Sequence, residues 1–195
     1  MSVASDDFLD WAIARAVSTG PATGSFYAVS DQAGSGAHAL TQSFTIPGPA
    51  LSVTLSFSLF VNSYGGNLVN PIGLNFADGA NQHARVDILT AGASAFDTGA
   101  AVIRNFYLGV DAGTNPHAYT NYSFNITPQV GVGGTFQLRF AEVDNQLFLN
   151  MGVDNVILDY TPLTGVPEPS SIMLVALGLA GLAVVRRRPD RGSAR

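Results

Sequence analysis

Hydrophobic and polar residues alternate with a period of two in several windows of the chain, which is the pattern of half-buried β-strands. The clearest window runs over residues 52–62, where one face is wholly apolar and the other carries hydroxyls and an amide. The apolar face consists of Val53, Leu55, Phe57, Leu59 and Val61, and the polar face of Ser52, Thr54, Ser56, Ser58 and Asn62.

Similar alternation, with turn-forming Gly, Pro, Asn and Asp clusters between the windows, predicts about eight strands in all. The other seven windows cover residues 25–29, 43–46, 84–90, 102–110, 121–127, 135–144 and 148–160. Many short strands with turn-rich gaps are typical of an all-β fold, and we expect an antiparallel β-sandwich of jelly-roll type.

The C-terminal region has a different pattern, because Ile172–Val185 contains fourteen residues without a polar side chain. As a helix it spans about 21 Å, which is short of the ~30 Å hydrocarbon core of a bilayer, and a run of this length also suits a buried core helix. However, it has no polar face and is bounded by Pro169 and by Arg186, Arg187 and Arg188. We therefore expect a single C-terminal transmembrane helix of minimal length, accommodated by bilayer thinning and arginine snorkelling.

Charge fixes the orientation of this helix, because arginine clusters stay on the cytoplasmic side of a membrane. Residues before Pro169 then lie across the membrane, with Val166, Pro167, Glu168 and Pro169 at its outer interface. Two prolines bar a helix there and hold the segment extended, in a form that a protease can grip.

These three parts, in this order, resemble the PEP-CTERM sorting domain of Gram-negative bacteria. The resemblance covers about thirty residues and implies recognition by exosortase, a membrane-embedded cysteine enzyme that cleaves near the Pro-Glu-Pro motif. Carried over by position, Val166–Pro169 is the recognition motif and holds substrate residues, not catalytic ones. The implied route is export across the inner membrane, transient anchoring there with a cytoplasmic arginine tail, and delivery to the cell surface or extracellular matrix.

Such a route needs an N-terminal secretion signal, and the first residues have Asp6, Asp7 and Asp10 where a signal has positive charge. We therefore expect the natural start to lie upstream. The predicted parts are an N-terminal segment (1–22), a β-sandwich ectodomain (23–163), a sorting domain (164–189, with motif 166–169, helix 170–185 and arginine cluster 186–188) and a tail (190–195).

Composition narrows the function of the ectodomain. Before Gly165 the chain has four Arg, no Lys and twelve Asp or Glu, a net charge of −8 that disfavours binding to nucleic acid. The absence of Cys excludes thiol catalysis and cysteine-based metal sites.

A structural Ca²⁺ is one candidate cofactor. Alternation places Asp154 on the core face with Val156, Leu158 and Tyr160, where an unpaired carboxylate is costly. Carboxylate oxygens are preferred Ca²⁺ ligands, and similarity to carbohydrate-binding-type and galactose-binding-like jelly rolls, seen in the run Gly152–Leu158, implies a calcium ligand here. Asp31, from an early loop, is the proposed second ligand. The alternative is that Asp154 caps a turn or pairs with an arginine.

Two further sets of residues suit either catalysis or structure. Glu142 and Asp144 have the residue types of a glycosidase pair, but side chains two apart on one strand are neighbours and do not flank a bond. We expect them to be structural, held by an arginine such as Arg85 or Arg139. The histidines follow no metal-binding motif, and we expect those beside turn signals, His83 and His117, to lie in loops, while His38 has no assigned role.

Tyrosines near predicted loops are candidates for sugar binding, and Tyr64 and Tyr119 are the best placed for exposure. The function expected from the sequence is that of a non-enzymatic, exosortase-sorted surface or matrix protein, either polysaccharide-binding or structural. The alternative is a secreted hydrolase that acts on extracellular glycan. The expected partners are exosortase, the inner membrane and an exopolysaccharide, and nucleic acid is not among them.

Overall fold

The computed structural model describes residues 20–30 and 34–163, and this part of the chain forms eight strands and one short helix. All eight windows predicted from the sequence are strands. Their bounds are β1 (Ala28–Ser30), β2 (Gly36–Ile46), β3 (Ala50–Ser63), β4 (His83–Thr90), β5 (Val102–Gly109), β6 (Thr120–Asn125), β7 (Gly134–Asp144) and β8 (Leu149–Pro162), and the helix is α2 (Thr127–Val130).

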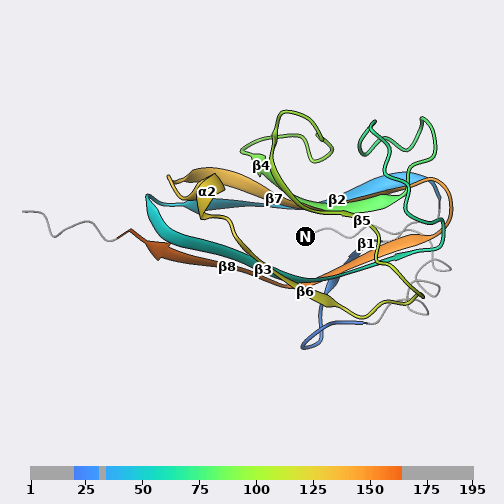
Figure 1. Ribbon diagram of the computed structural model, residues 1–195, viewed down its shortest axis with the longest axis horizontal. Helices are drawn as coiled ribbons and strands as arrows, with labels where there is room; N and C mark the ends of the chain where they lie inside the picture. Colours follow the sequence, from blue (N-terminus) through green and yellow to red (C-terminus); the bar gives the residue numbers. More distant parts are fainter. Residues whose placement is uncertain (1–19, 31–33, 164–195) are drawn as a thin grey trace, which may run out of the picture. The chain divides into compact units, whose positions relative to one another are not determined.

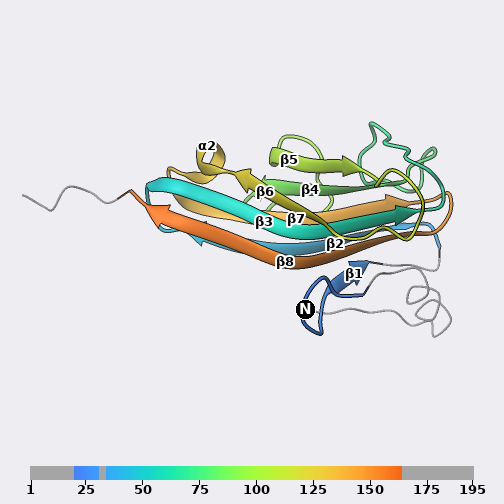
Figure 2. The same cartoon turned by 60° about the horizontal axis from the view of Figure 1, so that its bottom comes forward.

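The strands form two antiparallel sheets that face each other as a sandwich (Figure 1). Sheet 1 has the order β1-β8-β3-β6 and sheet 2 the order β2-β7-β4-β5. Figure 2 shows β8 and β3 running side by side along the length of sheet 1, with the short β1 beyond β8. The predicted all-β antiparallel sandwich is therefore confirmed.

The core lies between the sheets and follows the alternation of the sequence. The whole apolar face of residues 52–62 is buried, and Phe57 lies near its centre. The Phe57 ring stacks on Tyr122 of β6 and meets the edge of Phe140 of β7, with centroid distances of 5.2 Å in both cases. Because Phe140 belongs to sheet 2, this aromatic group joins the two sheets.

Strand β8 departs from strict alternation at Asn155, a non-glycine residue with φ of 51°. Its pairing with β3 shifts register between Ser56 and Ser58, as at a β-bulge. Before the bulge Val153 faces the core, so its neighbour Asp154 points to the outer side of sheet 1. The prediction that Asp154 shares the core face of Leu158 was therefore wrong, because one left-handed residue reverses the alternation between them.

No helix within residues 20–30 and 34–163 has the length and apolar character needed to cross a membrane. The predicted membrane helix (170–185), the sorting motif (166–169) and the arginine cluster (186–188) all lie outside the described residues.

Candidate functional site

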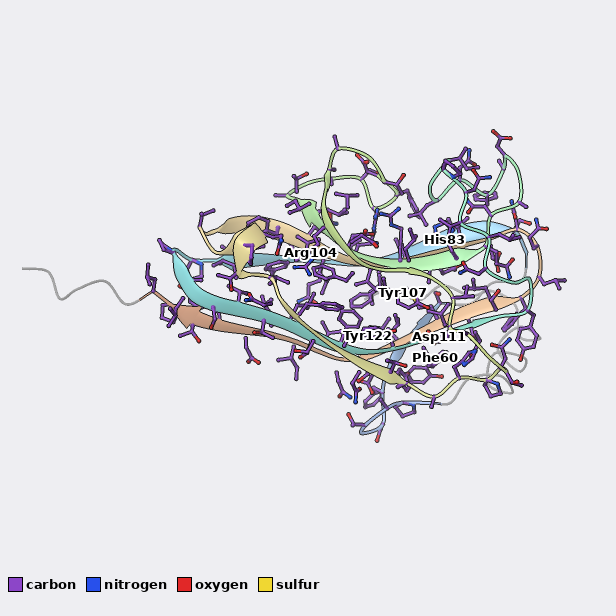
Figure 3. All side chains as sticks on the ribbon, in the orientation of Figure 1. Phe60, His83, Arg104, Tyr107, Asp111 and Tyr122 are labelled. Atoms are coloured by element: carbon purple, nitrogen blue, oxygen red, sulfur yellow. The ribbon has the colours of Figure 1, made fainter. Side chains whose placement is uncertain are left out.

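The N-terminal segment before β1 and the stretch before β6 both lie over the outer side of sheet 1. They enter it from opposite edges, because β1 and β6 are the edge strands of this sheet. Phe60, on the outer face of β3, is fully buried and meets the edge of the Tyr119 ring at a centroid distance of 4.9 Å. Figure 3 shows Phe60 on this outer side, whereas Tyr107 and Tyr122 lie between the sheets. Gly152 of β8 lies beneath Phe60, and any side chain there would overlap the ring. A residue without a side chain is thus needed for the aromatic pair to form.

Between these two segments lies an open pocket of about 390 Å³. This volume falls within the ~300–1,000 Å³ that is usual for small-molecule sites. The lining residues come from the N-terminal segment, from the stretch that enters β6, and from the bulge of β8. They are Pro21, Ala22, Thr23, Ala118, Tyr119, Asn121 and Asn155.

The polar residues of the pocket belong to one hydrogen-bonded chain that crosses the sheet. Thr23 Oγ1 donates to Asn155 Oδ1 at 2.6 Å, and Asn155 Nδ2 donates to Ser58 Oγ at 3.2 Å. Ser58 Oγ donates in turn to Asn121 Oδ1 at 2.7 Å. The amides and hydroxyl that a ligand would meet are therefore held in place before any ligand arrives.

Asp154 fixes the N-terminal segment that forms one wall of the pocket. Its Oδ2 accepts the backbone N–H of Thr23 at 3.0 Å, and its Oδ1 accepts the backbone N–H of Asn155 at 2.7 Å. Both carboxylate oxygens are thus used by backbone donors, one of them from a distant segment of the chain.

The described residues do not show a metal site that includes Asp154. The proposed partner, Asp31, lies outside the described residues. Across the part of the chain that the structure describes, no group of three or more His, Asp or Glu side chains is placed to hold a metal ion. Calcium binding stays a prediction.

Tyr119 is the aromatic residue among those that line the pocket. Burial, followed by the nearby Tyr27 and Asp154, raises the pKa of the Tyr119 phenol, so the group stays neutral at physiological pH. Its hydroxyl has no hydrogen-bond partner among the described residues. Tyr64 lies elsewhere, at the end of β3, where it is 45% exposed and its ring contacts Phe148. Tyr64 is not among the residues that line the pocket.

The two carboxylates predicted on β7 are buried, and the ion pairs of Arg85 and Arg139 within the described residues go to another acid. Glu142 Oε1 lies 2.9 Å from Nδ1 of His38, which is the residue opposite it on β2. Asp144 lies two residues further along the same strand and pairs with Gly36. The expectation that Arg85 or Arg139 holds these carboxylates was wrong, because both arginines bind a different acid on the other face of sheet 2.

That acid is Asp87, which forms a buried charge cluster that the sequence analysis missed. Arg85 donates two hydrogen bonds to its carboxylate, at 2.7 and 2.8 Å, and Arg139, opposite Asp87 on β7, also donates two. Asn105 Nδ2 adds another at 2.8 Å. Burial opposes ionisation of Asp87, but the hydrogen bonds from Arg85, Asn105 and Arg139 outweigh it and hold the pKa below its usual value. The i, i+2 spacing of Arg85 and Asp87 was the available signal.

The histidines do not come together. His83 is the first residue of β4 and is buried, so the prediction that it lies in a loop was wrong; burial lowers its pKa, so the ring stays neutral. His117 does lie in a loop, where its backbone N–H donates to Asn62 Oδ1 at 2.7 Å. His38 lies within β2.

A second set of polar contacts connects the edge strand β5 of sheet 2 with sheet 1. Tyr107 donates to Asp111 Oδ1 at 2.9 Å, while Asp111 Oδ2 accepts the N–H of Val61 at 2.8 Å (Figure 3). Further along β5, the Arg104 guanidinium donates to the carbonyl oxygen of Asn125 on β6 at 3.0 Å. These contacts join sheet 2 to sheet 1 and suit a structural role.

Comparison with known proteins gives one match, over the C-terminal residues. Residues 165–188 match the model of the PEP-CTERM protein-sorting motif. No curated protein and no solved structure matches the chain.

Proposed function

We propose that this chain, which carries a PEP-CTERM sorting motif at residues 165–188, is a non-enzymatic surface or matrix protein that exosortase releases and whose β-sandwich binds saccharide. The motif match is the observation that carries the sorting part of the proposal. A motif of this kind implies export and a membrane-anchored C-terminal sorting signal. We infer that Ile172–Val185 is the transmembrane anchor and that Arg186–Arg188 stays in the cytoplasm.

The strand order supports a jelly roll as the architecture of the exported body. The chain passes between the two sheets so that β1, β3, β6 and β8 form one and β2, β4, β5 and β7 the other. Jelly rolls are double-sheet folds of eight antiparallel strands. They present loops and sheet faces to solvent, and the pocket lies on such a face.

The pocket around Tyr119 supports saccharide as the ligand. An aromatic side chain offers an apolar surface to the carbon face of a sugar ring, while Thr23, Asn121 and Asn155 offer donors and acceptors for its hydroxyls. These polar groups are already oriented by their own hydrogen bonds. Preorganisation lowers the entropic cost of binding.

The negative net charge of the β-sandwich ectodomain favours neutral saccharides over acidic ones as the ligand. Among the described residues, no arginine lines the pocket, and the chain before Gly165 carries a net charge of −8. A uronic acid or sulfated sugar would therefore be repelled and would find no cation to pair with. We propose neutral hexose units of an extracellular polysaccharide as the ligand class.

Binding to a panel of neutral and acidic polysaccharides, followed by analysis of the recovered glycan, tests this part of the proposal. The unaltered protein should retain a neutral polysaccharide and return it unchanged. Tyr119→Ala should weaken retention by about tenfold, because it removes one aromatic contact of roughly 1 kcal/mol or more. Tyr64→Ala is the matched control and should bind as before. Shortened glycan would show a hydrolase instead, and equal retention by both variants would place the ligand elsewhere.

A further inference from the structure

One end of the sandwich carries exposed apolar side chains on three adjoining segments. The first is the turn from β2 to β3 with the start of β3, the second is the turn from α2 to β7, and the third is the last residue of β8. We call this surface the apolar tip, and it consists of Pro47, Pro49, Leu51, Val132 and Pro162. Val132 is 85% exposed and Leu51 is 65% exposed, which are high values for aliphatic side chains in a folded domain.

Direct contacts hold the three segments of the apolar tip together as one surface. The backbone N–H of Ala50 donates to the carbonyl of Gly131 at 2.8 Å, which ties the first turn to the second. Gly133 packs so closely on Gly48 that a Cβ on Gly133 would lie 3.1 Å from the Gly48 Cα. Ala50 also pairs with Pro162 across β3 and β8. Figure 1 shows α2, the start of β3 and the arrowhead of β8 at the same end of the sandwich.

The apolar tip is uncharged in a body rich in acidic residues. Residues 46–53, 126–135 and 160–163 contain no Asp, Glu, Lys, Arg or His. Contiguous exposed apolar surface marks an interaction site more often than singly scattered apolar side chains do.

Chain length then indicates what the tip faces. β8 ends at Pro162, and Pro169 follows seven residues later. Seven residues reach at most about 25 Å when fully extended. The headgroup layer on one side of a bilayer is about 5–8 Å thick. If Ile172–Val185 spans the membrane, this short connection keeps the end of β8 close to the headgroups.

We propose that the apolar tip rests in the headgroup layer of the membrane that holds the C-terminal anchor, which orients the sandwich while exosortase acts. This inference rests on the anchoring part of the proposed function. Aliphatic and proline side chains enter this layer readily, and an uncharged end avoids the repulsion that anionic lipid exerts on an acidic body. The apolar tip is thus the end of the sandwich that can approach the lipid most closely.

Other exposed apolar side chains provide the control. The segment between β3 and β4 contains Val69, which is 44% exposed, together with Ile72 and Phe76. It begins at the end of β3 opposite Ala50 and contains the charged Asp78. The short connection after β8 therefore gives no reason for Val69 to contact lipid, and Val69 serves as the control position.

Single cysteines are unique labelling sites, because the chain contains no natural cysteine. The full chain with Val132→Cys, Leu51→Cys or Val69→Cys is labelled with an environment-sensitive fluorophore and reconstituted into phosphatidylethanolamine–phosphatidylglycerol vesicles. Flotation verifies attachment, and lipids with a doxyl group near the headgroup quench the label. Quenching at positions 132 and 51 should exceed that at position 69 by about twofold or more, since interfacial side chains lie ~5–10 Å into this layer.

Equal quenching at all three positions in vesicles that carry the floated protein would overturn the tip proposal and leave the anchor intact. Failure of the chain to float with the vesicles would overturn both. Shielding at position 132 that grows with the protein-to-lipid ratio would identify a second copy as the occupant, and shielding only when exosortase is added would identify the enzyme. Either result would contradict the lipid assignment.

Discussion

Gly152 is the residue on which the outer side of sheet 1 depends most directly. It leaves room for the Phe60 ring, which in turn supports Tyr119 of the pocket. Gly152→Ala should lower the free energy of unfolding by about 1–3 kcal/mol, because the added methyl forces a buried aromatic ring to move. Urea unfolding measures this loss. Gly48→Ala is the matched control, since a Cβ there meets nothing within 4 Å, and an equal loss in both variants would contradict the packing argument.

Asp87 gives the protein a specific dependence on pH. Its pKa is lowered in the folded state, so its contribution to stability is present above the unfolded value of 3.8 and is lost as the pH falls through the folded value. Asp87→Asn leaves two buried arginines without a counter-charge and should cost about 3–5 kcal/mol at pH 7. The gap between variant and unaltered protein should narrow below about pH 4 as Asp87 itself becomes protonated. Unfolding curves at pH 7 and pH 3 that stay equally far apart would argue against this role.

At the level of single residues, the sequence predicted the sides of straight strands well and failed where one residue changed the geometry. Every residue predicted on the apolar face of β3 is in the core, because strict alternation holds there. Asp154 was misplaced because Asn155 takes a left-handed conformation that nothing in the neighbouring residues signals. Tyr119 lines the pocket together with Thr23 and Asn155, which are more than thirty residues away in sequence and could not be assigned to it.

The segment from β4 to β5 shows how the charge cluster acts on a whole element. Nη1 of Arg139 donates to the carbonyl of Ala95 at 2.8 Å and to that of Asp97 at 2.6 Å, so one arginine holds the connecting segment against sheet 2. These hydrogen bonds depend on the cross-strand pairing of Asp87 with Arg139, which requires the register of β4 against β7. Sequence alone does not supply that register, which explains why the arginines were assigned to the wrong acids.

Arg139→Lys tests the hydrogen bonds from Arg139 to the connecting segment separately from the positive charge of the side chain. A lysine keeps the positive charge but cannot donate to Asp87 and to two carbonyls in the fork geometry of a guanidinium. Amide hydrogen exchange across residues 91–101 should therefore become faster by tenfold or so, as expected for the loss of about 1.4 kcal/mol of local stability. Arg85→Lys is the control, because the hydrogen bonds of Arg85 go to Asp87 and not to this segment. Equal acceleration in both variants would show that the segment responds to general loosening of the cluster.

At the scale of the whole molecule, the chain combines a sandwich that ends at Pro162 with a sorting motif that begins almost at once. The order of motif, apolar run and arginine cluster is local in sequence, so the sorting region could be identified without any structure. The pocket and the apolar tip are assembled from distant segments and became visible only in the fold. The proposal about the apolar tip presupposes that the C-terminal region anchors the chain.

The most direct test of this account is the mass of the mature C-terminus. The chain is exported behind a secretion signal in a Gram-negative host with exosortase, and the protein recovered from the cell surface or medium is analysed by intact-mass spectrometry. We predict a product that ends near Val166–Pro169 and lacks the arginine cluster. A Pro167→Ala/Pro169→Ala variant should stay uncut in the membrane, while Pro71→Ala, in the exposed segment between β3 and β4, is processed normally. Surface protein that still ends at Arg195, or a motif variant that is cut like the control, would contradict the account.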